Sequence, residues 1–130
     1  MSRGLLDTSV FIAREQRRPL GQLPDELAVS VVTIGELELG VLAAGDPERR
    51  AQRADTLALA RSADPIAVTE AVMGAFARLT HDCRHAGKRP KILDALIAAT
   101  AIEHGLAVVT QDDDFAAMAQ AHPRLVIERV

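Results

Sequence analysis

The stretch ILDALIAATAIEHGLAVVT, residues 92–110, decides the fold. Between Ile92 and Ile102 it contains only two polar side chains, and a helix that is apolar on nearly every side is a buried one. Gly105 stands where that helix should stop, and the apolar run 106–109 is typical of a buried strand. The stretch therefore predicts a buried helix followed directly by a buried strand, as in proteins that cover a parallel sheet with helices.

Strand-like and helix-like segments alternate outward from this unit along the whole chain. We expect strands near residues 4–7, 27–31, 66–68, 106–110 and 125–128, and helices near 9–18, 33–44, 47–62, 69–86, 92–104 and 114–121. No repeat or linker marks a second domain. The pattern predicts an α/β fold in which residues 1–130 form a single domain: a central, mainly parallel sheet of about five strands, with helices on both faces in three α/β/α layers.

Carboxylates stand where these apolar segments end, or inside one of them. Asp7 closes the first strand, Glu36 follows the second in what should be the first turn of a helix, and the pair Asp112 and Asp114 follows the strand 106–110. Asp94 lies within the buried helix, where an ionised carboxylate is costly unless it is paired or binds a metal. Ligands bind open α/β sheets at the carboxyl ends of the strands, so the acids are candidates for one shared site.

Most of these acids also have an ordinary structural interpretation. Asp7 could simply cap the helix that follows it, and Thr33 to Glu36 fits a capping box in which Glu36 accepts from the Thr33 amide. Asp112 and Asp114 could cap the helix near residue 115 and complement its dipole. Asp94 has the weakest structural alternative, because its helix offers it no cationic partner.

Composition restricts the setting of the protein. The 130 residues are 48% hydrophobic, enough for one core, and the single cysteine, Cys83, excludes an internal disulfide and a cysteine-based zinc site. The four histidines lack zinc-site spacing, so we expect them to face solvent. We find neither a signal peptide nor a run long enough to cross a bilayer, and we expect the protein in the cytoplasm without membrane contact.

Charge is distributed unevenly. The formal net charge of −3 argues against indiscriminate binding of nucleic acid. The arginines at 14, 17 and 18, and those at 49, 50 and 53, are best interpreted as solvated helix faces. A third group includes Lys88, Arg89 and Lys91 and runs straight into the helix of Asp94, so a phosphate-binding rim and a solvated loop are equally good interpretations of it.

Crowded carboxylates favour a particular chemistry. They repel one another and raise one another's pKa unless a divalent cation offsets their charge. Oxygen ligands of this kind suit Mg²⁺ or Mn²⁺, and such an ion can orient a phosphodiester and activate a water. Hydrolysis of phosphodiester bonds is therefore the reaction that fits best.

Four segments carry a resemblance to a known family. They are Leu5 to Ser9, Thr33 to Leu37, Leu93 to Ala101 and Thr110 to Phe115. In order and spacing they resemble the four acidic motifs of PIN-domain nucleases, most of all the VapC toxins of bacterial toxin–antitoxin modules.

The resemblance implies a PIN-like fold and a Mg²⁺- or Mn²⁺-dependent endoribonuclease, usually a homodimer, that a VapB-type antitoxin silences by occupying its active-site groove. By position, Asp7 and Asp94 would be the principal metal ligands, Asp112 would complete the acidic site, and Glu36 would hold or deprotonate a metal-bound water. The resemblance also implies products with a 5′-phosphate and a 3′-hydroxyl. Supporting roles fall to Asp114 and to the hydroxyls of Thr8, Ser9 and Thr110, which would orient the carboxylates.

Two other classes compete with this interpretation. A receiver-type phosphorylation switch has a similar length and an acidic Mg²⁺ pocket, but it needs a lysine after a late strand, and the last lysine here is Lys91. The alternative that stays open is a catalytically silent module that keeps the PIN fold and binds metal or RNA. Metal binding without turnover would identify it.

Overall fold

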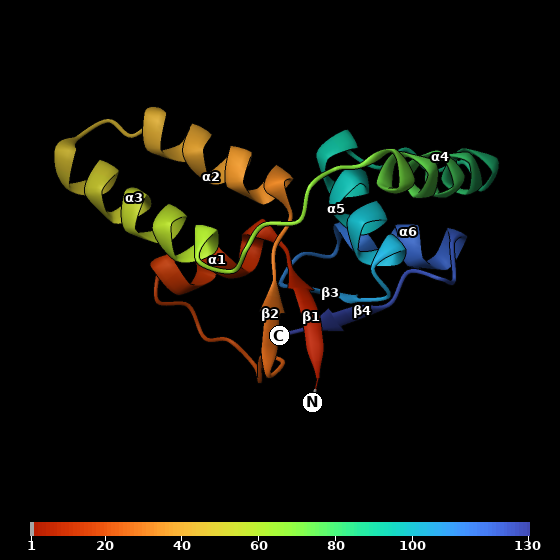
Figure 1. The fold of residues 1–130 in the computed structure, drawn as a ribbon, viewed down its shortest axis with the longest axis horizontal. Coiled ribbons are helices and arrows are strands. Elements are labelled where there is room, and N and C mark those ends of the chain that lie inside the picture. Colours follow the sequence, from red (N-terminus) through yellow and green to blue (C-terminus); the bar gives the residue numbers. More distant parts are fainter. Residues whose placement is uncertain (1) are drawn as a thin grey trace.

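The structure, a computed structural model, describes residues 2–130 and forms an α/β fold (Figure 1). Its strands are β1 (Arg3–Leu6), β2 (Glu26–Ala28), β3 (Ala107–Thr110) and β4 (Ile127–Arg129). Its helices are α1 (Thr8–Glu15), α2 (Val31–Leu42), α3 (Pro47–Arg61), α4 (Glu70–His85), α5 (Ile92–Glu103) and α6 (Asp114–Ala121). The predicted buried helix and strand of residues 92–110 correspond to α5 and β3. None of the helices in the described part of the chain combines the length and the apolar character that crossing a bilayer requires.

The four strands form one parallel sheet in the order β2-β1-β3-β4. The chain leaves β1 for β2 on one side and later returns to place β3 on the other side. The crevice between the carboxyl ends of β1 and β3 is thus the topological switch point, where open α/β sheets bind ligands. Asp7 follows β1 directly, and Gln111 and Asp112 follow β3.

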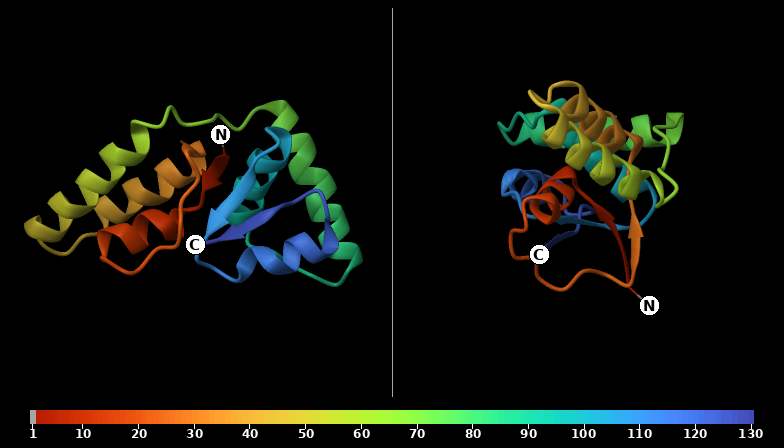
Figure 2. Two further views of the ribbon diagram at one scale, coloured as in Figure 1. Left: turned by 90° about the horizontal axis from the view of Figure 1, so that it is seen from below. Right: turned by 90° about the vertical axis from the view of Figure 1, so that its left-hand side faces the viewer.

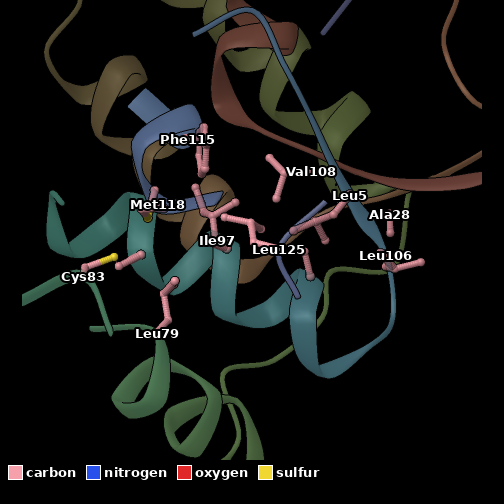
Figure 3. Close-up of a cluster of buried hydrophobic side chains, with 13 residues drawn as sticks. Leu5, Ala28, Leu79, Cys83, Ile97, Leu106, Val108, Phe115, Met118 and Leu125 are labelled. Atoms are coloured by element: carbon pink, nitrogen blue, oxygen red, sulfur yellow. The ribbon is translucent and has the colours of Figure 1, made fainter. Parts of the chain in front are cut away.

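Helices cover both faces of the sheet, as the three-layer prediction requires. One face packs Leu5 and Val108 against α4, α5 and α6, in the cluster drawn in Figure 3. The other face packs Leu6 and Val109 against α1, α2 and α3. Neighbouring strand residues point to opposite sides, so a single strand such as β1 serves both cores.

The helices form two groups, one on each face of the sheet. α2 and α3 pack together as a hairpin that projects to one side, while α4 packs on α5 at the other side (Figures 1 and 2). Gly87 and Gly105 end α4 and α5, as predicted, with φ of 74° and 64° in the left-handed region. In each case the backbone amide of the residue after the glycine donates to a carbonyl near the end of the helix. Lys88 donates to Cys83, and Leu106 donates to Ala101.

Two expectations from the sequence, the number of strands and the first-turn position of Glu36, are wrong, and so is one alternative interpretation. The sheet has four strands and not about five, because the segment at 66–68 contributes only an isolated bridge between Ile66 and Ser30. The capping box at Thr33 does not form either. Ser30 caps α2 by accepting from the Val32 amide at 3.0 Å, so the helix begins two residues early and Glu36 lies in its second turn.

Candidate active site

Asp7 is the most enclosed acid at the carboxyl edge of the sheet. Only 2% of its surface is exposed, and its backbone amide donates to the carbonyl of Val109, which continues the pairing of β1 with β3. Its carboxylate caps α1 by accepting from the Ser9 amide at 3.4 Å. Oδ2 also accepts from the Thr110 hydroxyl at 3.0 Å. One side chain therefore both caps a helix and belongs to the site.

Hydroxyl groups link the ends of β1 and β3. Thr110 Oγ1 lies 3.3 Å from Ser9 Oγ and accepts from the Asp112 amide at 2.9 Å. Ser9 Oγ in turn accepts from the Gln111 amide at 3.0 Å. Thr110 is fully buried and Ser9 nearly so. These bonds fix the backbone that carries Asp112 relative to the carboxylate of Asp7.

Glu36 reaches the same region from α2. Its Oε1 accepts from the Thr8 hydroxyl at 2.7 Å, and Thr8 Oγ1 also lies 3.1 Å from the buried Thr33 hydroxyl. Thr8, the first residue of α1, thus ties α2 to the end of β1. The bond occupies one carboxylate oxygen of Glu36 and leaves Oε2 as its second acceptor.

Asp94 stands in the first turn of α5 and is half-buried. Desolvation, followed by the charges of Asp7, Asp114 and Glu36, raises its pKa to about 6, and Lys91 opposes the rise. Charge effects of this kind need close approach. The structure therefore brings Asp94 together with acids from the end of β1, from α2 and from the start of α6.

The two acids after β3 differ in their surroundings. Asp112 is exposed, but desolvation of its carboxyl, then the charges of Asp7 and Asp114, raise its pKa, while Lys91 and Arg18 lower it. Asp114 begins α6 and pairs with Lys91 at 3.6 Å, and neither Asp112 nor Asp114 caps that helix. The N-cap is Asp113, whose carboxylate pairs with Arg129.

The basic segment at residues 88–91 opens onto this acidic centre. A cavity of about 290 Å³ lies here, lined by Lys88, Arg89, Pro90, Lys91, Asp94, Asp113, Asp114, Ala117 and Met118. Lys88 is 3.4 Å from Gln120, and Lys91 pairs with Asp114 as described. Cations and acids therefore line one cavity, so the phosphate-rim interpretation stays a prediction.

The donor set suits a hard divalent cation. Within residues 2–130 no three His, Cys, Asp or Glu side chains are already close enough to enclose a metal ion. Mg²⁺ does not need such a cage, because it keeps several waters and binds through one or two carboxylates together with substrate phosphates. Desolvation and then mutual repulsion raise the pKa of Asp94 and Asp112, and a bound cation would offset both effects.

Arg53 is a residue of this region that the sequence did not reveal. Its pattern in α3 suggested a solvated helix face, but it is half-buried and donates from Nη1 to the Gly40 carbonyl at 2.7 Å. It lines a second cavity together with Thr8 and Glu36. The sequence near Arg53 does not predict its inward orientation, because that orientation depends on how α3 packs against α2.

His122 departs from the expected solvent-facing position of the histidines. It is 7% exposed, and its Nδ1 lies 2.7 Å from Asp82 Oδ2, which joins the end of α6 to α4. The pair supports the fold on the side of the sheet that carries α4, α5 and α6.

A comparison with family models matches residues 4–121 of the chain to the PIN domain. Among curated proteins, Ribonuclease VapC8 of Mycobacterium tuberculosis is 64% identical over 100 residues, which are 75% of this chain and 89% of that protein. Ribonuclease VapC4 of the same organism is 50% identical over 118 residues, which are 89% of this chain and 91% of that protein.

Among solved structures, a similar one is the crystal structure of VapBC-5, a member of the VapBC family of toxin–antitoxin systems from Mycobacterium tuberculosis. It matches with a TM-score of 0.89 and 41% identity, and the match covers 100% of both chains. The likeness extends over the sheet and both groups of helices, including every element that carries one of the acids.

Proposed function

The chain belongs to the PIN-domain family, and we propose that it is the ribonuclease toxin of a VapBC-type toxin–antitoxin pair, cutting RNA internally with the help of Mg²⁺ or Mn²⁺. One observation carries the metal-dependent part of the proposal. Acids from the end of β1, from α2, from α5 and from the start of α6 gather at the switch point of the sheet, where burial first, and then the charges of the neighbouring acids, raise the pKa of Asp94 to about 6.

Asp7, Asp94 and Asp112 are the residues that would hold the cation. Asp7 is fixed by the bonds from Thr110 and Ser9, while Asp94 carries the unrelieved charge repulsion. When bound, a divalent cation supplies Lewis-acid polarisation of the phosphodiester and a water of lowered pKa. Hydrolysis of this kind needs no nucleophilic side chain from the protein.

Glu36 would take the proton from the attacking water. Thr8 donates to Oε1 and holds the carboxylate in one orientation, so Oε2 is the oxygen that accepts the proton. The water oxygen bonds to phosphorus as the bond from phosphorus to the 3′-oxygen breaks. The products are a 5′-phosphate and a 3′-hydroxyl, the latter after the leaving oxygen takes up a proton.

Lys88, Arg89 and Lys91 would bind phosphates of the RNA strand. They line the same cavity as Asp94, so a strand held there passes next to the acids. Asp114, which pairs with Lys91, would hold that lysine at the edge of the site. A cationic rim next to an acidic centre lets a protein of net negative charge bind a polyanion locally.

A VapB-type antitoxin is the partner of this chain, in a heteromeric complex. We further propose that the toxin forms a homodimer and acts in the cytoplasm, where structured cellular RNA is available. Size-exclusion chromatography with light scattering, with and without the coexpressed antitoxin, tests both assemblies. A monomeric free toxin would refute the homodimer.

The test of the activity is cleavage of a mixed pool of structured cellular RNAs by purified protein with Mn²⁺ or Mg²⁺, with the fragment ends mapped. EDTA and Asp94→Asn should both abolish discrete cuts. Glu103→Gln is the matched control, because it neutralises an exposed acid at the other end of α5. Bound metal without any cutting would instead support the catalytically silent module.

A further inference from the structure

The second cavity beside the acidic centre lies among α1, α2 and α3. It has a volume of about 210 Å³ and is lined by Thr8, Ile12, Glu15, Gln16, Glu36, Leu37, Gly40 and Arg53. It shares Thr8 and Glu36 with the proposed catalytic site, and these two are joined by the 2.7 Å bond. A group bound in this cavity would therefore lie next to the reacting phosphate.

Arg53 enters the cavity in a fixed orientation. Its Nη1 donates to the Gly40 carbonyl at 2.7 Å, which anchors the planar guanidinium to α2. A guanidinium carries five donors in a rigid fork, so several N–H groups are still available to a ligand. The anchoring reduces the side-chain freedom that a ligand would otherwise have to freeze.

Glu15 lines the same cavity and has the opposite charge to Arg53. Its carboxylate can only accept hydrogen bonds when ionised, and the residue is half-buried at the last position of α1. The Gln52 side chain donates to the Glu15 backbone carbonyl at 3.1 Å and ties this end of α1 to α3. Ile12 and Leu37 supply apolar surface to the same cavity.

The charges of this cavity disfavour a phosphate and favour a nucleobase. Glu15 and Glu36 together outweigh the single positive charge of Arg53, so a phosphate group would meet net repulsion. A base that carries both acceptors and donors suits a lining that contains a guanidinium and carboxylates better. Guanine is such a base, because O6 and N7 accept while N1–H and the N2 amino group donate, and Arg is the usual partner of O6 and N7.

We propose that this cavity binds the guanine base of a nucleotide next to the scissile phosphate, with Arg53 donating to O6 and N7 and Glu15 accepting from N1–H and N2–H. Selection in single-stranded RNA commonly uses an unstacked base whose edges are read in this way. The inference rests on the proposed ribonuclease function and adds to it a base preference at one position beside the cut.

The test uses short single-stranded RNAs that contain a mapped cleavage site, with all four bases placed in turn at each position flanking the cut. Guanine at one flanking position should raise kcat/KM by about tenfold or more over the other bases, the size of one good bidentate contact. Replacing that guanine by 7-deazaguanine removes N7, and replacing it by hypoxanthine removes the N2 amino group. Each replacement should lower kcat/KM in the wild-type protein.

Variants connect each base atom to its partner. Arg53→Gln should abolish the sensitivity to 7-deazaguanine, and Glu15→Gln should abolish the sensitivity to hypoxanthine. Arg53→Lys keeps the charge and a donor toward Gly40 but loses the fork, so it should still cleave while losing the guanine preference. Arg49→Gln, an exposed arginine on the same helix α3, should behave as the wild type.

The possible results separate the base pocket from the catalytic proposal. Cleavage without a guanine preference at either flanking position would overturn the base pocket alone. The base pocket would also be overturned if Arg53→Gln and Arg53→Lys kept the guanine preference of the wild type. A loss of rate that is equal for all four bases leaves the preference unchanged and has the same meaning. Failure of the wild type to cut any RNA with metal present would overturn the proposed function and the base pocket together.

Discussion

The two halves of the acidic site are built in opposite ways. The strand-end half, made of Asp7, Ser9, Thr110 and Asp112, is held by hydrogen bonds between the ends of β1 and β3. The helix half is Asp94, in the first turn of α5, for which no side-chain hydrogen bond or ion pair occurs within residues 2–130. Asp7 is enclosed and satisfied, whereas Asp94 is half-buried and repelled by its neighbours.

The difference shows which part of the site is already formed in the folded protein before a ligand binds. Sheet pairing places Asp7 and Thr110 side by side, so the strand-end half forms as the fold forms. Asp94 is brought close by the packing of α5 on the sheet, at a cost in charge repulsion. A divalent cation is the partner that would turn this cost into binding energy.

The largest expected effect is the loss of cleavage when either half loses its carboxylate, and the free energy of unfolding then distinguishes the two halves. Asp7→Asn and Asp94→Asn should each reduce cleavage by more than about 100-fold, since even residues that only orient metal ligands cost about 10–100-fold. Asp7→Asn should also lower the free energy of unfolding, because it weakens the acceptor of Thr110. Asp94→Asn should leave that free energy unchanged or higher in metal-free buffer. Equal losses of stability in urea unfolding would contradict the distinction.

The substitution Thr110→Val tests the strand-end half and should have a smaller effect on activity. The change removes the donor to Asp7 and the acceptor of the Asp112 amide, so we expect a loss of about 10–100-fold in activity and of about 1–3 kcal/mol in stability. Thr80→Val is the matched control. Its buried hydroxyl has no partner within residues 2–130, so its removal should be neutral or stabilising. Similar results for the two variants would show that the hydroxyl network does not matter.

The acids of both halves could be predicted from the sequence, because each stands at a recognisable place in a local apolar segment. Asp7 and Asp112 stand one or two residues beyond apolar strands, and parallel strands bring their carboxyl ends to one edge whatever the details of packing. Asp94 was predictable from its place in an apolar helix. The supporting hydroxyls of Thr8, Ser9 and Thr110 were expected from the resemblance to the PIN-domain motifs, and the structure places all three against carboxylates or their backbone.

Features that depend on packing were missed or misplaced. The segment at 66–68 has strand-like residues, but it meets the sheet region only through the bridge from Ile66 to Ser30. The choice of Ser30 over Thr33 as N-cap moved Glu36 into the second turn of α2, since both residues are suitable caps. Arg53 has the pattern of a solvated helix face and turns inward only because α3 crosses α2 near Gly40.

A still smaller effect concerns the basic rim next to the helix half. Neutralising Lys88, Arg89 and Lys91 together should weaken RNA binding and lower the slope of log K against log salt by up to about 2, at about 0.7 for each RNA phosphate that the variant no longer neutralises. The control replaces three exposed arginines that line neither cavity of the site, namely Arg49, Arg61 and Arg124, with glutamine. A salt slope that changes equally in both triple variants would count against a specific rim.

The smallest effect is a dependence of stability on pH in the helix half. The pKa of Asp94 is about 6 in the folded protein and 3.8 without the shift, so the folded state holds the proton more tightly. Asp94 should therefore lower stability as pH rises from about 4 to 6, by about 1 kcal/mol once solvent screening is allowed for. Unfolding of the wild type and Asp94→Asn across this range in EDTA should show the difference growing with pH. A constant difference would contradict the shifted pKa.

The central claim is that Asp94, a carboxylate that is partly desolvated and repelled by neighbouring acids, gives this site its affinity for a divalent cation. Its most direct test is thermal unfolding of the wild type, Asp94→Asn and Glu103→Gln, each with EDTA and then with rising Mn²⁺ or Mg²⁺. The account predicts that the cation raises the unfolding temperature of the wild type and of Glu103→Gln, and that Asp94→Asn loses most of the rise. An equal rise in Asp94→Asn would contradict it.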